Sequence, residues 1–444
     1  MTDVLFRPVA DVAGMLHRKE ISSRELTELL FARTDAVNPT LNAVVAQRRE
    51  AALREAAAAD EATAHGVTAG PLHGLPITIK ESFDVAGLGT TWGNPAFRDF
   101  VATTDATVVH RLRDSGAIVT GKTNVAFMLA DFAQTANDLY GVTRNPWAAG
   151  RTPGGSSGGA AAAVAAGLTF LEHGTDLVGS VRIPASFCGV YGLRPSVGTV
   201  PLTGMQPPGV VAGPSDMTYL SAVGPLARSA ADLRIALRVV AGPEVPQASA
   251  YSWKLAAPRR SRLRDFRVGV VLDHPAAPVT SEVGAGLSAA VDAVATAGAT
   301  IVEGWPSGVD PVRDAESFGF HVGLFFAYAQ PGDDLPAFVD VIAQEQRRMA
   351  ARAAWTRYFA DLDVFICPAT FAGALAQDDR DDRLAFWTAH PALAGLPAVV
   401  APVGRTPAGL PVGAQLVGPL HEDDTAITFA ELLAEVVGGY EPPN

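Results

Sequence analysis

Two serines and one lysine in the first half of the chain have the side chains of a histidine-independent hydrolase. Ser156 and Ser180 lie in one glycine-rich segment, Gly154–Pro184, and Lys80 ends the apolar run Leu75–Lys80. A serine hydroxyl can attack a carbonyl carbon, a second hydroxyl can pass on the proton, and a neutral lysine can accept it. These side chains could therefore form a nucleophile, a proton relay and a base.

The lysine can act as a base only in a suitable environment. A free lysine has a pKa of about 10.4 and is charged at neutral pH, so it must be desolvated to lose its proton. Ile77 and Ile79, which flank Lys80 in the apolar run, could exclude water from it. The same relay run backwards would protonate the leaving nitrogen of an amide, which is the difficult part of breaking that bond.

Two other motifs match known signatures but lie in the wrong context. Gly116–Thr123 has the spacing of a phosphate-binding P-loop, yet its interior is a strand-forming run, so we expect the end of a strand. Gly154–Gly158 fits the G-x-S-x-G nucleophile elbow of α/β-hydrolases. That elbow must follow a strand, whereas Trp147–Pro153 is loop-like, so an α/β-hydrolase is the lesser alternative.

Composition narrows the class of protein. The chain has 444 residues, of which 48% are hydrophobic and 18% charged, as expected for a globular enzyme with a large core. A net charge of −12 argues against a nucleic-acid-binding surface. The basic cluster Arg259–Arg264 is expected to be a solvated linker, and Cys188 and Cys367 are expected to be buried free thiols.

Neither targeting signals nor metal-binding patterns stand out. The N-terminus lacks the pattern of a signal peptide, and no apolar run is long enough to cross a membrane. We therefore expect a cytoplasmic protein. The amino-acid composition would suit a bacterium. The histidines show neither HxH nor HExxH spacing, so we expect a metal-independent mechanism with no cofactor. Nothing in the sequence specifies an oligomeric state.

Hydrophobic patterning predicts strands that alternate with helices. The first two helices are expected after an N-cap at Ser22 or Ser23 and over Ala43–Ala64. Further on, the pattern indicates a mixed or parallel sheet layered with helices. The expected strands are Leu75–Ile79, Ala117–Thr120, Val190–Leu193, Arg267–Leu272, Ala299–Val302 and Asp363–Cys367, and the expected helices are Ala106–Ser115, Glu282–Ala297 and Leu335–Phe359.

Several motifs in order resemble those of the amidase signature family and together span nearly the whole chain. They are Leu75–Gly87, Gly121–Asn124, Thr143–Trp147, Gly154–Pro184, Gly189–Pro195, Gly224–Arg228, Gly395–Ala398 and Gly409–Gly418. The resemblance implies an α/β fold with a central mixed sheet covered by helices on both faces. It also implies one domain over residues 1–444, with a helical segment at 1–65, a catalytic core at 66–242 and a C-terminal part at 265–444 that completes the same sheet.

The resemblance assigns roles to the three reactive side chains. Ser180 would be the nucleophile and Lys80 the base. Ser156 would be the bridging serine, held in the family on a cis peptide bond with the residue before it, here Gly155. Thr175, Asp176 and Arg182 would brace the turn that carries Ser180.

The oxyanion hole implied by the resemblance consists of the backbone N–H groups of Leu177, Val178, Gly179 and Ser180. The family usually has two glycines before the nucleophile, and Val178 replaces the first of them. A β-branched residue resists positive φ and adds bulk, so we expect a reshaped pocket with the hole retained.

Two further departures from the family concern the substrate side of the site. Ala392 stands where the family commonly has Asn, after the Asp-rich segment 370–391, which we interpret as solvated or as a lid. Residues after Gly121–Asn124 are more apolar than in the family. We expect a substrate pocket lined by Met128, Leu129, Phe132 and Gln134, with core packing as the alternative for the apolar members.

The resulting hypothesis is a stand-alone amidohydrolase that acts on linear, non-peptide C–N bonds of small molecules. Aryl and aliphatic amides, esters and carbamates (urethanes) are all accessible to one acyl-enzyme route. The main alternative is the A subunit of a tRNA-dependent glutamine amidotransferase, which would pass ammonia to a partner. A catalytically inactive binding protein is disfavoured because Lys80, Ser156 and Ser180 are all present.

Overall fold

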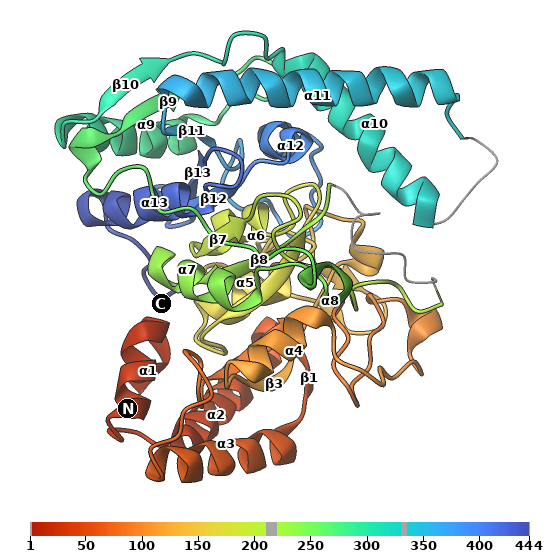
Figure 1. Ribbon diagram of the computed structural model, residues 1–444, viewed down its shortest axis with the longest axis vertical. Coiled ribbons are helices and arrows are strands. Elements are labelled where there is room, and N and C mark those ends of the chain that lie inside the picture. The colour runs from red at the N-terminus through yellow and green to blue at the C-terminus, as the bar shows by residue number, and fades with distance from the viewer. Residues whose placement is uncertain (1, 210–219, 330–334, 444) are drawn as a thin grey trace.

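The computed structural model describes residues 2–209, 220–329 and 335–443, and an eight-stranded sheet lies at its centre (Figure 1). The strands of this sheet are β6 (Glu172–Asp176), β7 (Tyr191–Arg194), β8 (Ala222–Ala227), β9 (Arg267–Val270), β10 (Thr300–Glu303), β11 (Val364–Pro368), β12 (Ala398–Arg405) and β13 (Pro411–Val417). Their order is β10-β9-β11-β13-β12-β7-β8-β6. β9 pairs in parallel with β10 and β11, and the other pairs are antiparallel, so the sheet is mixed.

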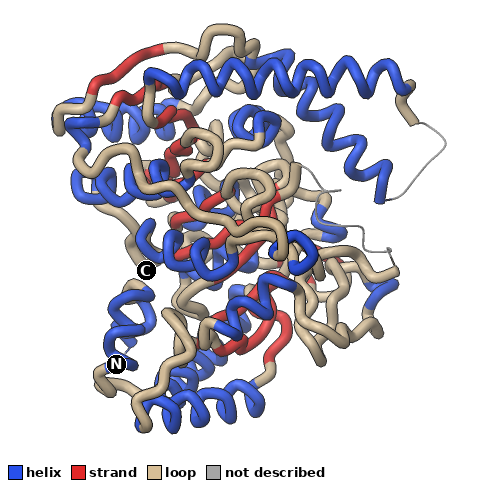
Figure 2. The backbone as a smooth tube through the Cα atoms, viewed as in Figure 1, coloured by secondary structure: helices blue, strands red, loops and turns tan. Residues whose placement is uncertain are grey.

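Helices surround the sheet, as the blue and red segments of Figure 2 show. They are α1 (Val9–His17), α2 (Ser23–Leu41), α3 (Arg49–Ala64), α4 (Thr107–Asp114), α5 (Gly158–Ala165), α6 (Arg182–Cys188), α7 (Ala230–Val240), α8 (Val245–Ala248), α9 (Ser281–Thr296), α10 (Pro311–Ala329), α11 (Phe338–Asp361), α12 (Leu384–Ala394) and α13 (Asp423–Val437). α7, α9 and α13 pack on one face of the sheet and α5 and α6 on the other.

The two faces of the sheet lead into different cores because successive side chains of a strand point to opposite sides. Val399 of β12 belongs to the core under α7, α9 and α13, and the next residue, Val400, belongs to the core around α5 and α6. This arrangement confirms the expected α/β fold with a mixed sheet covered on both faces.

A smaller sheet carries the candidate base. β1 (Val44–Gln47), β2 (Pro76–Lys80) and β3 (Ile118–Thr123) form it in the order β1-β3-β2, and β2 lies against β6 of the large sheet. β4 (Ala136–Asn137) and β5 (Gly141–Val142), which follow β3 in the chain, form a separate two-stranded ribbon. The strand through Ile118–Thr123 confirms that the P-loop-like motif is not a phosphate loop.

The strands and helices predicted by residue range are present with shifted ends, and one of the helices begins late. Ser22 caps α2 and forms a capping box with Glu25. The helix expected over 43–64 begins only at Arg49, because Val44–Gln47 pairs with β3 as a strand, which suits its β-branched residues. Helices α5, α6, α7, α12 and α13 are not among the expected helices, and neither is α10. Its aromatic residues are interrupted by Gly319 and Gly323, which hides its helical period.

The basic cluster at 259–264 is more than a solvated linker. The Arg259 guanidinium donates to the Glu422 carboxylate, 2.5 Å, and to the backbone carbonyls of Phe359 and Leu362. Arg260 pairs with Asp363. Arg259 and Arg260 therefore hold this segment to the C-terminal elements, while Arg260, Arg262 and Arg264 are exposed, as expected for a solvated linker. Cys188 and Cys367 are buried and free, as expected.

No helix within the described ranges is both long and apolar enough to span a bilayer.

Candidate active site

Lys80 lies at the end of strand β2 with its side chain completely buried. Its Nζ is 2.7 Å from Ser156 Oγ and 2.8 Å from Thr175 Oγ1. Burial lowers the pKa of Lys80 to about 7, against the opposing pull of the Asp176, Glu172 and Glu81 carboxyl groups. A large part of the Lys80 population is therefore neutral near pH 7, which is the state that a base requires.

The Gly155–Ser156 peptide bond, which carries the second serine, is cis. The Gly155 N–H donates to the Phe132 carbonyl, 2.9 Å, and a Cβ at position 155 would lie only 2.2 Å from the Gln134 carbonyl oxygen. Only glycine fits at such a close backbone approach. Helix α5 begins just beyond, at Gly158, and its glycines and alanines are fully buried, so small residues let this helix pass beneath the site.

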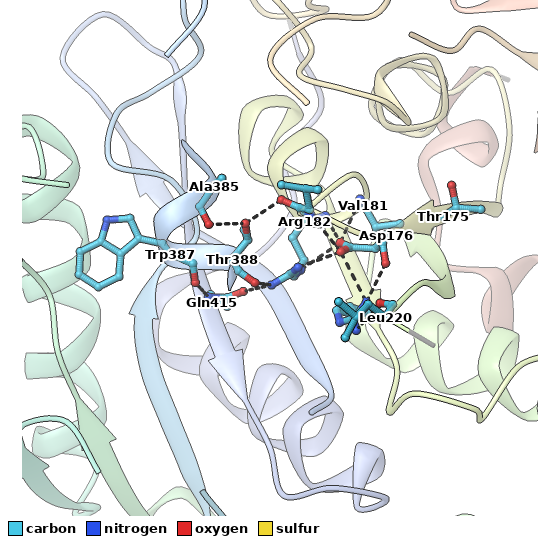
Figure 3. Close-up of polar contacts among 12 residues, drawn as sticks. Thr175, Asp176, Val181, Arg182, Leu220, Ala385, Trp387, Thr388 and Gln415 are labelled. Atoms are coloured by element: carbon cyan, nitrogen blue, oxygen red, sulfur yellow. Dashed lines mark hydrogen bonds and ion pairs between the residues drawn. The ribbon is translucent and has the colours of Figure 1, made fainter. Parts of the chain in front are cut away.

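Asp176 organises the turn that follows β6 (Figure 3). One of its carboxylate oxygens accepts from the Gly179 N–H, 3.0 Å, and the other from the Val181 N–H, 3.1 Å. The Arg182 guanidinium binds both oxygens, at 3.0 and 2.8 Å. Burial alone would raise the pKa of Asp176, but Arg182 and Arg194 outweigh burial and lower it to about 2. The carboxylate thus stays charged and fixes the turn.

Ser180 follows directly from this turn and is the most accessible of the three candidate residues. Ser180 is 6% exposed as a residue, whereas Ser156 is 1% and Lys80 0% exposed. The Ser157 N–H donates to the Ser180 carbonyl, 3.1 Å, which joins the two serine segments. The structure therefore brings all three elements together and places Ser180 on the solvent side.

Three of the four predicted oxyanion donors find no acceptor among the described residues. Across the described residues, the backbone N–H groups of Leu177, Val178 and Ser180 have no hydrogen-bond acceptor. The Gly179 N–H is instead bound to Asp176. Gly179 has φ +112°, while Val178 is not among the positive-φ residues. Val178 therefore does not have to adopt positive φ, because the left-handed position falls on the remaining glycine.

A cavity of about 560 Å³ opens in front of Ser180. Its wall is almost entirely apolar and includes Leu177 and Val178 from the turn and Phe132 and Leu129 from the preceding loop. Two predicted pocket residues do not contribute to this wall. Met128 packs with its sulfur 3.4 Å from the Asn94 amide nitrogen, and Gln134 is buried with its amide bound to the Asp379 carbonyl, 2.7 Å.

Most of the remaining cavity wall comes from two helices that sequence reasoning did not assign to the site. α10 contributes Phe318, Val322 and Phe326, and α12 contributes Ala385, Phe386 and Ala389. The i, i+4, i+8 spacing on α10 and the i, i+1, i+4 spacing on α12 are the sequence signals that mark these faces, but the same spacing also marks ordinary core helices.

Side-chain bonds hold the Asp-rich segment before α12 to the loop that contains Asp131 and Gln134. The Arg380 guanidinium pairs with Asp131, 2.8 Å, and the Gln377 amide donates to the Gln134 side chain, 2.8 Å. Asp382 and Arg383 at the end of this segment contribute to the cavity wall. This part of the segment thus adjoins the cavity and is held by side-chain bonds.

The family model described as Amidase matches residues 25–327 and 337–427 of the chain, which include every candidate site residue. The chain belongs to the amidase signature family. Among curated relatives of this amidase, an acylamidase from Rhodococcus erythropolis is 34% identical over 95% of this chain and 93% of its own length. The A subunit of a glutamyl-tRNA(Gln) amidotransferase from Synechococcus sp. (strain CC9605) is 34% identical over 94% of this chain and 93% of its own.

Solved structures give the amidase the same fold. A 6-aminohexanoate cyclic dimer hydrolase complexed with substrate aligns with a TM-score of 0.79 and 27% identity, covering 98% of this chain and 97% of the other. A bacterial aryl acylamidase of the amidase signature family has a TM-score of 0.83 at 24% identity, a likeness of fold alone. The relatives thus include both stand-alone amidases and components of amidotransferases.

Proposed function

We propose that this amidase is a stand-alone amidohydrolase for linear, non-peptide amides with apolar acyl or aryl groups. The observation that carries the proposal is the apolar cavity of about 560 Å³ whose wall includes Ser180. Cavities of this size hold small organic molecules, and an apolar lining selects apolar groups by removing their surface from water.

In the proposed first step, Ser180 Oγ attacks the acyl carbon of the amide. Its proton passes to Ser156 Oγ as Ser156 gives its own proton to Lys80 Nζ, 2.7 Å away. The carbonyl oxygen becomes an oxyanion, which would accept hydrogen bonds from the N–H groups of Leu177, Val178 and Ser180, unpaired among the described residues. Each such donor is worth about 3 kcal/mol in acyl-transfer enzymes.

The second step breaks the C–N bond. Lys80 returns its proton through Ser156 to the leaving nitrogen, the amine departs, and the acyl group remains on Ser180 as an ester. Water then adds to this ester and gives up a proton along the same relay, after which Ser180 is released with its own proton and the acid leaves. Esters and carbamates can follow the same steps, since only the leaving group differs.

A second candidate function is the A subunit of a glutamine-dependent amidotransferase, because many similar curated relatives carry that name. Glutamine brings a charged α-amino and α-carboxylate group, whose burial requires charged or polar partners. Asp382 in the cavity wall could pair with the α-ammonium group, but the α-carboxylate lacks a free partner: Arg383, the one cationic side chain in the wall among the described residues, is already paired with Asp381. The cavity therefore supports the stand-alone enzyme better.

The decisive experiment combines covalent labelling with substrate comparison on the purified chain alone. We expect a fluorophosphonate to modify Ser180, as mapped by peptide mass spectrometry, and the label to be lost in Lys80→Ala. We also expect hydrolysis of an acyl anilide to exceed that of glutamine by orders of magnitude. Modification at Ser156 would favour the nucleophile-elbow mechanism, and glutaminase activity that appears only with partner proteins would favour the amidotransferase.

A further inference from the structure

One peptide group beside the nucleophile is held at both ends by side chains. The Val178–Gly179 peptide receives a hydrogen bond at its carbonyl from Thr388 Oγ1, 2.7 Å, and donates from its N–H to Asp176, 3.0 Å. A peptide group is planar, so two bonds at opposite ends fix how the whole plane is rotated about the chain. The plane in question lies one residue before Ser180.

The fixation matters because Gly179 has little preference of its own. Its φ of +112° belongs to the region that glycine enters freely, and glycine enters the alternatives as freely. The N–H groups of Val178 and Ser180 belong to the peptide groups just before and just after this one. Rotation of the Val178–Gly179 peptide plane would therefore change the angle between them. Oxyanion donors act only when they converge on one point. External bonds must therefore set this conformation.

Thr388 is itself firmly placed on α12. Its side chain is fully buried, and its backbone carbonyl accepts from the Arg182 guanidinium, 2.8 Å. Arg182 also binds Asp176, so the groups that hold the two ends of the peptide are joined through one arginine (Figure 3).

The local sequence of α12 makes this anchoring possible. Pro391 lies inside the helix and lacks the N–H that would pair with the Trp387 carbonyl. The Gln415 amide donates to that carbonyl instead, 2.8 Å, and its oxygen accepts from Arg182, 2.7 Å. Thr388 Oγ1 has only one proton to donate. The Val178 carbonyl is 2.7 Å away and the Ala385 carbonyl of the same helix 3.1 Å, so the hydroxyl donates to Val178.

We propose that Thr388 is a positioning residue for the oxyanion-binding turn, and that it couples α12, which forms part of the cavity wall, to the donors beside Ser180. Its hydroxyl holds the Val178 carbonyl, and through the planar peptide it orients the turn without touching the substrate. This inference rests on the proposed role of Ser180 as the nucleophile.

The test compares fluorophosphonate labelling rates of Ser180 in wild type, Thr388→Val and Thr388→Ser. Valine keeps the shape of threonine without the hydroxyl, and serine keeps the hydroxyl. We expect Thr388→Val to lower the maximal labelling rate about tenfold, as for the loss of one buried hydrogen bond, with little change in the half-saturating probe concentration. Thr388→Ser should restore the rate to within about threefold of wild type. Should the valine variant not fold, Thr388→Ala provides the same comparison.

A matched control separates orientation from stability. Thr34 is also a buried helical threonine, and its hydroxyl donates to the Leu30 carbonyl, 2.8 Å, in α2. Thr34→Val should lower the melting temperature without slowing the labelling of Ser180. Labelling of folded Thr388→Val at the wild-type rate would overturn the inference alone. A wild-type protein that is not labelled at Ser180 would overturn the proposed function and this inference with it.

Discussion

Lys80 Nζ lies 2.7 Å from Ser156 Oγ, although the two residues are 76 positions apart in the sequence. Lys80 ends a strand of the small sheet, and Ser156 lies in the loop before α5. β2 packs against both β6 and α5, and this packing creates the contact. The base is therefore assembled by the contact between the two sheets, and its strength as a base depends on the water that this contact excludes.

The first prediction concerns pH. With a pKa of about 7, Lys80 is neutral above that value and charged below it. The kcat/KM for a substrate without ionisable groups should therefore rise about tenfold per pH unit below pH 7 and level off above it. A pH–rate profile between pH 5 and 9 measures this directly.

Glu172 supplies the control for this profile. It is one of three fully buried carboxyl groups near Lys80, and burial raises its pKa to about 8, opposed by hydrogen bonds that include one from Thr78. The rise through pH 7 should persist in Glu172→Gln. A profile that is flat from pH 5 to 9 in the wild type would contradict the assignment of Lys80 as the base.

The second prediction is that Lys80→Met stabilises the protein while abolishing its activity. The pKa of Lys80 is lower in the folded state than in the unfolded state, where it is 10.5, so between pH 7 and 10.5 the unfolded state binds more protons. Stability therefore rises with pH across this window, and near pH 7 the buried lysine costs about 4 kcal/mol. The hydroxyls of Ser156 and Thr175 lose a partner in the variant, which costs about 1 kcal/mol each.

We therefore expect Lys80→Met to raise the free energy of unfolding by about 2 kcal/mol at pH 7. The gain should disappear near pH 10, where the penalty for burying the lysine is small. Urea denaturation at both pH values measures the difference. A gain that is equal at the two pH values would show that it arises from packing and not from the buried charge.

The third prediction concerns the relay. Ser180→Ala and Ser156→Ala should each lower kcat by at least about a thousandfold, since residues that act as one unit are lost together. Ser115→Ala is a matched control, because Ser115 is also buried and its hydroxyl donates to the Leu112 carbonyl of α4, 2.6 Å. Near-full activity of Ser156→Ala would mean that Lys80 reaches Ser180 by another path.

Local patterns predict the apolar strand that ends at Lys80 and the flexible glycines around Ser156. The roles of Lys80 and of the turn at Asp176 and Arg182 come instead from the resemblance of whole motifs to the family, because no local pattern predicts that a lysine is buried. Val44–Gln47 is only four residues long and is followed by an alanine-rich helix, so in the sequence it looks like the start of that helix. Pairing with β3, which the local sequence does not indicate, makes it a strand instead.

The cavity wall and the Thr388 contact could not be predicted for a different reason. Thr388 and Val178 are 210 residues apart, and no local pattern indicates that one hydroxyl meets one carbonyl. Phe318 and Phe386 line the cavity only because α10 packs against α12. The apolar spacing of such helices reveals that a face is buried but not what it faces. Met128 illustrates the converse, since it neighbours Leu129 in sequence yet does not contribute to the cavity wall.

The fourth prediction addresses Val178, whose side chain lines the cavity beside Ser180. Val178→Gly removes this bulk next to the acyl position. We expect the ratio of kcat/KM for an α-branched acyl anilide to that for its unbranched isomer to rise about tenfold, the usual effect of small volume changes in an apolar pocket. Because Val178 is only partly buried, stability should fall by about 1 kcal/mol, the conformational cost of glycine. Measuring both substrates on both proteins, with melting temperatures alongside, tests this. An unchanged ratio would mean that Val178 does not limit the size of the acyl group, and that the apolar walls from α10 and α12 set the substrate range instead.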